Sequence, residues 1–134
     1  MLTVADLMTK SVVTLTEVET LAQAADTLSN LAVSGAPVCD ANEKVVGVFS
    51  KSDLVNRLVD GRLDTNATVG AHMTRITVAL RPTDTILRAA EVMAEKMIHR
   101  VVVVDDDGRL VGIVSPLDIL KAVHDGRLEL TARA

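Results

Sequence analysis

The chain repeats itself at an offset of 65 residues, and this internal repeat constrains its fold more than any other feature. The matched segments are identical or conservatively changed and need no gap: Met8-Thr9 with Met73-Thr74, residues 46–50 with 111–115, and residues 60–63 with 125–128. Two copies are too few to stack as a solenoid. We therefore expect two similar units, residues 1–64 and 65–134, packed on each other as a pseudo-twofold pair.

Each copy predicts the same order of elements: strand, helix, strand, strand, helix. We expect strands at residues 12–15, 36–39, 45–49, 76–80, 101–104 and 110–114, and helices at 21–31, 50–61, 86–97 and 116–124. Apolar residues at helical spacing follow Thr20, which forms a capping-box pattern with Gln23. The strands are apolar on nearly every residue, as expected for a sheet covered on both faces. The fold class is α/β, and residues 64–67 are expected to link the two copies.

The composition excludes several classes of partner. The chain has no Trp, no Tyr and one Phe (Phe49), so its core is aliphatic and no aromatic platform is available for single-stranded nucleic acid. A net charge of -4 argues against binding to a nucleic-acid backbone, although a small phosphorylated ligand needs only a local positive charge. The single Cys39, the lack of a signal peptide and the lack of a membrane span predict a cytoplasmic protein.

One junction, Gly-x-x-Ser-x-x-Asp, occurs in both copies where a strand meets a helix. It reads Gly47…Ser50…Asp53 in the first copy and Gly112…Ser115…Asp118 in the second. A Ser followed three residues later by an acidic residue is a capping box, which alone explains the pattern. A helix N-terminus also offers N–H groups to a phosphate, and an Asp can accept hydrogen bonds from a ribose diol. Both interpretations stay open.

These junctions, the two Met-Thr pairs and the segments 33–40 and 98–105 make the chain resemble a tandem pair of CBS (cystathionine-beta-synthase) domains, also called a Bateman module. The resemblance covers nearly the whole chain. It implies the CBS fold and a cleft between the repeats that binds an adenosine derivative such as AMP, ADP, ATP or S-adenosylmethionine. It also implies a homodimer formed through helices and a regulatory action on a partner protein.

The same resemblance implies a role for each matching residue. The ribose hydroxyls would be bound by Asp53 and Asp118, and the phosphates by Ser50, Lys51 and Ser115. One side of the base would contact Val33, Ser34, Ala36, Pro37, Ile98, His99, Val101 and Val102. The other side of the base would contact Ser11, Val12, Ile76 and Thr77. Two departures predict unequal sites: Val102 replaces the proline found at Pro37, and Pro116 replaces Lys51. A solvated surface lysine and a structural histidine are the alternatives for Lys51 and His99.

Other chemistry is not expected. The three histidines, His72, His99 and His124, lack metal-ligand spacing. Residues 105–108 lack the pattern of a calcium loop and predict a hairpin turn. No catalytic arrangement is visible.

The sequence therefore predicts a stand-alone regulatory module without catalytic activity, cofactor or metal. The alternatives are a protein-interaction scaffold with empty clefts and a sensor of S-adenosylmethionine or NAD.

Overall fold

The repeated apolar segments form two β-hairpins, each followed by a helix that begins where the second strand of its hairpin ends. The computed structural model describes residues 2–61 and 64–129. The chain divides into two compact units: the middle unit, Val13–Thr77, and the terminal unit, Met1–Val12 with Val78–Ala134. The opening segment of each sequence repeat therefore packs with the body of the other repeat.

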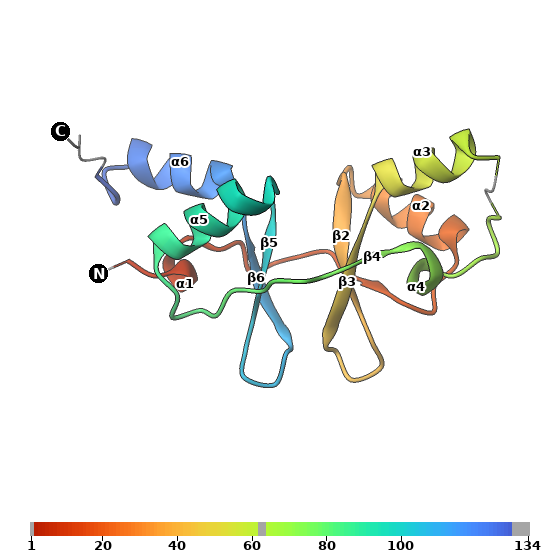
Figure 1. The fold of residues 1–134 in the computed structure, drawn as a ribbon, viewed down its shortest axis with the longest axis horizontal. Helices are drawn as coiled ribbons and strands as arrows, with labels where there is room; N and C mark the ends of the chain where they lie inside the picture. The colour runs from red at the N-terminus through yellow and green to blue at the C-terminus, as the bar shows by residue number, and fades with distance from the viewer. Residues whose placement is uncertain (1, 62–63, 130–134) are drawn as a thin grey trace. The chain divides into compact units, whose positions relative to one another are not determined.

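The middle unit contains a four-stranded sheet in the order β1-β2-β3-β4. Figure 1 labels its strands β2, β3 and β4. Its elements are β1 (Leu15–Thr16), α2 (Leu21–Asn30), β2 (Gly35–Cys39), β3 (Val45–Ser50), α3 (Lys51–Val59), α4 (Val69–His72) and β4 (Thr74–Arg75). Strand β1 runs parallel to β2, whereas β2–β3 and β3–β4 are antiparallel. The core lies between the sheet and the helices. Phe49 is fully buried there, surrounded by aliphatic residues such as Leu21 and Leu28.

The terminal unit repeats this arrangement, but its sheet has two strands, β5 and β6, among the described residues. Its elements are α1 (Val4–Leu7), α5 (Ile86–Lys96), β5 (Val101–Val104), β6 (Leu110–Val114) and α6 (Pro116–His124). Single bridges, Leu80 with Val103 and Thr9 with Ile113, stand where the middle unit has β1 and β4. Helix α1 closes the core, in which Val4 is fully buried.

The predicted hairpins and the four longer helices are confirmed within one or two residues, but the predicted first strands are wrong in extent. Strand β1 covers Leu15–Thr16 rather than 12–15, and its counterpart at 76–80 is reduced to the bridge at Leu80. A proline explains the difference. The N–H of Glu17 donates to the Cys39 carbonyl at 3.2 Å, whereas the equivalent Pro82 has no N–H to extend the ladder.

Helices α1 and α4 were not expected from the sequence. Each has only four residues, too few to show an apolar period. Their N-caps, Thr3 and Thr68, are the local signals that could have indicated them. The expected linker at 64–67 forms a turn in which the Asp64 carboxylate accepts from the Asn66 N–H at 3.0 Å.

Candidate functional site

Both Ser-x-x-Asp junctions form complete capping boxes. In the middle unit, Asp53 Oδ2 accepts from the Ser50 N–H at 2.8 Å and from the Ser50 hydroxyl at 3.1 Å. The Asp53 N–H donates to Ser50 Oγ at 3.3 Å. In the terminal unit, Ser115 and Asp118 make the same three bonds at 2.8, 3.1 and 3.4 Å. Because each serine hydroxyl already donates to its aspartate, it is not free to donate to a ligand unless it rotates.

The capping bonds use only one oxygen of each carboxylate. Within the described part of the chain, no hydrogen bond reaches Oδ1 of Asp53 or Asp118, and both residues are half-buried. A carboxylate oxygen has two lone pairs, so Oδ1 can accept hydrogen bonds from two hydroxyls. Each junction can therefore keep its capping box and still bind a diol.

The capping bonds do not by themselves identify a ligand site. Thr3 and Asp6 form the same motif at α1: Asp6 Oδ2 accepts from the Thr3 N–H at 2.7 Å and from its hydroxyl at 3.3 Å. The hydrogen bond from the Thr3 backbone lowers the pKa of Asp6 below its ordinary value. No ligand role is expected at α1, so the surroundings of the two Ser-x-x-Asp junctions must distinguish them.

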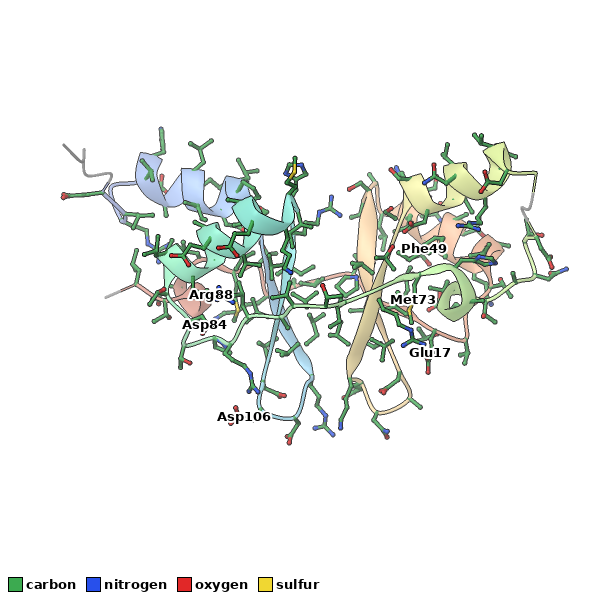
Figure 2. The ribbon with its side chains drawn as sticks, in the orientation of Figure 1. Glu17, Phe49, Met73, Asp84, Arg88 and Asp106 are labelled. Carbon is green, nitrogen blue, oxygen red and sulfur yellow. The ribbon has the colours of Figure 1, made fainter. Side chains whose placement is uncertain are left out.

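A glycine in each junction strand allows a methionine to pack directly on the backbone. A Cβ on Gly47 would lie 2.6 Å from Met73 Sδ and 2.7 Å from the Thr74 carbonyl oxygen. A Cβ on Gly112 would lie 2.7 Å from Met8 Sδ and 3.0 Å from the Thr9 oxygen. Figure 2 labels Met73 beside the strands of the middle unit. The Met-Thr pairs and the junction glycines thus have a structural role: each pair anchors the opening segment of one repeat to the junction strand of the other.

In the middle unit, the start of β2 lies beside the junction. Gly35 pairs with Ser50, and the Lys51 N–H donates to the Ser34 carbonyl at 2.9 Å. Val33 and Ser34 are therefore neighbours of the helix N-terminus. The Lys51 side chain is exposed and forms no ion pair with another described residue.

Several expected wall residues are buried in the cores. Ala36 is 3% exposed and Val101 2% exposed, each within the apolar cluster of its own unit. Pro37 and Val102 are also buried. These residues can offer main-chain groups to a ligand, but little side-chain surface.

Two segments, Ser11-Val12 and Ile76-Thr77, were expected to contact the second side of the base. They lie beside the junction strands β6 and β3, toward the end of each strand that is away from its serine. The pairs Val48–Thr74 and Gly47–Arg75 carry the chain away from Ser50 as it continues to Ile76 and Thr77. Ser11 and Val12 likewise follow the bridge between Thr9 and Ile113. The backbone pairing thus brings these residues beside the junction strands.

The terminal unit has an apolar pocket of about 420 Å³ beside its junction. Two alanines of α5 line it together with Met93, Met97, Ile98, His99, Pro116 and Ile119. Ser115 and Asp118 do not line it, but Pro116 and Ile119 belong to the first turn of the same helix, α6. The pocket therefore joins two expected wall residues, Ile98 and His99, to the N-terminus of α6.

Arg100 is a residue to which the sequence motifs assign no role. It precedes β5 by one residue, and Val101 pairs with Val114, so Arg100 lies across from Ser115. Its counterpart in the middle unit is Gly35. Two differences between the repeats could have identified Arg100 from the sequence. The terminal unit has Pro116 where the middle unit has Lys51, and it has Arg100 where the middle unit has Gly35.

The remaining candidates have structural explanations. Asp105 Oδ1 accepts from the N–H groups of Asp107 and Arg109 at 2.9 and 3.0 Å, which confirms the hairpin turn. Among the described residues, no three His, Cys, Asp or Glu side chains are grouped so that they could hold a metal ion. Partial burial raises the pKa of the Cys39 thiol, with smaller contributions from Asp40 and Glu43. That direction agrees with an unreactive thiol.

Comparison with known proteins decides the family. The model of the CBS domain matches this chain twice, over residues 4–60 and 69–125. The chain belongs to the CBS-domain family. The tandem CBS pair and its α/β fold, expected from the sequence, are confirmed.

Solved structures of CBS proteins resemble this one. CBSX2, in complex with AMP, has a TM-score of 0.80 and 28% identity, covering 94% of this chain and 98% of that one. The CBS domain pair of protein MJ0100, in complex with 5-methylthioadenosine and S-adenosyl-L-methionine, has a TM-score of 0.80 and 26% identity, covering 93% of this chain and 98% of that one.

A curated relative is an enzyme. The inosine-5'-monophosphate dehydrogenase of Methanocaldococcus jannaschii is 30% identical over 116 residues, which are 87% of this chain and 22% of the enzyme. The chain also spans less than half of the length of the first curated relatives it matches. No described helix has the length and apolar character needed to cross a bilayer.

Proposed function

We propose that this CBS pair is a non-catalytic regulatory module that binds an adenosine derivative at its Ser-x-x-Asp junctions and modulates a cytoplasmic partner. The observation that carries the proposal is the unused Oδ1 of Asp53 and of Asp118, held at a helix N-terminus in both units. The capping box fixes each carboxylate in place before a ligand arrives. A preorganised acceptor loses little conformational entropy on binding.

Each carboxylate would bind the 2′- and 3′-hydroxyls of a ribose through Oδ1. The phosphate would then lie toward the N-terminal turn of α3 or α6, where the helix dipole favours an anion. In the middle unit, the exposed Lys51 would supply the counter-charge. In the terminal unit, where Pro116 replaces that lysine, we assign the counter-charge to Arg100. The base would contact Val33 and Ser34 in one unit, and Ile98 and His99 in the other.

The solved relatives support the class of ligand. CBSX2 is in complex with AMP, and the MJ0100 pair with 5-methylthioadenosine and S-adenosyl-L-methionine. These compounds share an adenosine core and differ at the 5′ position. For this chain we favour a 5′-phosphate, as in AMP, ADP or ATP, because a basic residue follows Ser50 directly in the middle unit (Lys51) and another precedes β5 in the terminal unit (Arg100).

Thermal melting with AMP, ADP, ATP, S-adenosylmethionine and NAD tests the proposal. A ligand at 100 times its dissociation constant stabilises the folded protein by about 2.7 kcal/mol, which is readily measured. A 2′-deoxy analogue should bind more weakly than its ribose parent. If none of these compounds at millimolar concentration raises the melting temperature, the proposal is wrong.

The variants must separate ligand contact from helix capping. Asp53→Ala and Asp118→Ala each remove a cap as well as the proposed ribose acceptor. Asp6→Ala is the matched control, because Asp6 makes the same capping bonds at α1. All three should lower the stability of the unliganded protein, but only the first two should reduce the ligand-induced shift. An equal reduction in all three would assign the Asp pair to capping alone.

A second proposed property is self-association through the helices. Helix α3 buries no residue and exposes Val55 (54%), Leu58 (62%) and Val59 (79%). Helix α6 exposes Leu117 (54%) and Leu120 (63%). Apolar surfaces of this kind on helices commonly mark protein interfaces. We propose that a second copy of the chain covers them.

Sedimentation analysis tests this second proposal. The unmodified chain should sediment as a dimer at micromolar concentration, and Leu58→Lys should shift it toward the monomer. Leu87→Lys is a control on α5, where Leu87 is 60% exposed but lies outside these two helices. A monomer at all concentrations would exclude the homodimer and leave another protein as the candidate partner.

A further inference from the structure

Met97 adopts a backbone conformation that glycine would adopt at lower cost. It ends α5 with φ +52° and ψ +43°, in the left-handed region. The next residue, Ile98, donates its N–H to the Met93 carbonyl at 3.1 Å, as in the usual left-handed helix ending. Glycine is the common residue there because a Cβ is disfavoured. Met97 is therefore retained at this position against a conformational cost.

The Met97 side chain is both exposed and placed at the pocket of the terminal unit. It is 86% exposed, yet it lines the pocket of about 420 Å³ together with Met93, Ile98 and His99. That volume lies within the range typical of sites for small organic ligands. Among the lining residues, His99 provides the one polar side chain. An apolar pocket with a single polar group suits a flat heteroaromatic ring.

The middle unit has no methionine at the two equivalent positions. Its equivalent residue, Ala32, has the same left-handed conformation with φ +53°. The equivalents of Met93 and His99 are Leu28 and Ser34. The two units thus share the backbone conformation at this position, and only the terminal unit has thioether side chains there.

We propose that Met97 is the base-contacting cover of the terminal unit: its thioether lies on the face of a purine ring seated between Met93, Ile98 and His99. This inference rests on the proposed function, because it assumes an adenosine ligand. The chain has no Trp or Tyr to stack on a base, and a polarizable thioether is the alternative that makes favourable contacts with an aromatic ring. Such a contact changes affinity by roughly 2- to 12-fold.

Methyl NMR of protein labelled with [methyl-¹³C]methionine tests the contact directly. Added AMP or adenosine should shift the Met93 and Met97 methyl signals upfield, because the ring current of a purine acts on atoms above its face. Met73, which packs on Gly47, reports on the middle unit in the same spectrum. The dissociation constant of the terminal unit comes from the Met93 signal.

Four variants separate the side chain from the backbone. Met97→Ala should weaken AMP binding at the terminal unit by roughly 2- to 12-fold, and Met97→Leu by less. Met97→Gly should weaken binding while raising the melting temperature, since glycine relieves the left-handed strain. Leu87→Ala, an exposed apolar residue at the opposite end of α5, should leave the affinity unchanged.

The outcomes distinguish this inference from the proposed function. If AMP raises the melting temperature but the Met93 and Met97 methyls do not move, or if Met97→Ala keeps the original affinity, the base contact is wrong and the proposed function stands. If Met97→Ala changes only self-association, the side chain belongs to a protein interface and the inference is overturned. If no adenosine compound binds, both fail.

Discussion

Gly47→Ala should destabilise the middle unit because the new methyl group meets backbone as well as side chain. The added Cβ would lie 2.6 Å from Met73 Sδ and 2.7 Å from the Thr74 carbonyl oxygen. The methionine can rotate away, but the Thr74 carbonyl belongs to β4, whose pairing places Arg75 opposite Gly47. The methyl must push β4 off β3. Overpacking of this kind costs about 1–3 kcal/mol, equivalent to a decrease of roughly 3–15 °C in melting temperature for a chain of this size.

The equivalent Gly112→Ala provides an internal comparison. There the backbone contact, with the Thr9 carbonyl, is looser at 3.0 Å, while the contact with Met8 Sδ is similar at 2.7 Å. Gly112→Ala should therefore cost less than Gly47→Ala. Adding Met8→Ala should relieve much of the Gly112→Ala penalty, whereas Met73→Ala should relieve only part of that at Gly47.

Urea unfolding of the four single and two double variants measures these differences. The interaction free energy of each double-mutant cycle isolates the sulfur contact from the backbone contact. A neutral Gly47→Ala, or full recovery of its stability by Met73→Ala, would show that the Thr74 carbonyl yields to the new methyl group without cost. A larger penalty at Gly112 than at Gly47 would contradict the expected order of the two costs.

Three further predictions concern residues away from the junctions. Glu43 has φ +65° in its hairpin turn, where the other repeat has Gly108. Glu43→Gly should therefore stabilise the protein by about 1 kcal/mol, measured by urea unfolding. A loss of stability would exclude backbone strain at this turn. Thr20→Ala removes the acceptor of the Gln23 N–H at 3.2 Å and should cost about 1 kcal/mol without altering any ligand response. Because burial raises the pKa of Cys39, its alkylation should be slower at pH 8 than that of a free thiol, and the midpoint of its rate profile should lie at higher pH.

The sequence was sufficient to predict the elements whose signals are local. The capping box of Thr20 and Gln23, the apolar period of α2 and the turn that begins at Asp105 are all set by residues within a few positions of one another. For the same reason, helix ends and hairpins were placed closely. The family also followed from the sequence, because its motifs recur twice in a fixed order.

The sequence could not indicate which copy each opening segment packs with. A repeat offset is the same whether Met8 contacts Gly47 or Gly112, and the structure places it on Gly112. The length of the first strand depended on a single N–H, present at Glu17 and absent at Pro82. The pocket at Met97 was hidden because its lining comes from two helices and a loop, and no linear motif records that convergence.

The site that we propose lies on the same helices as the surface that we propose for a partner. Asp53 is in the first turn of α3, and the exposed Val55, Leu58 and Val59 follow within that helix. If a phosphate recruits the Ser50 hydroxyl, the bond from that hydroxyl to Asp53 at 3.1 Å must be exchanged for one to the ligand.

Ligand binding would then be coupled to the order of the first turn of α3, and so to the surface that the partner contacts. By linkage, partner binding would change ligand affinity by the same factor. Amide hydrogen exchange provides the test: on addition of AMP, exchange should change at Ser52 and Asp53 and should stay constant at Gln23, whose cap has no proposed ligand. Unchanged exchange at a saturated junction would separate ligand binding from the helix and remove this route of regulation.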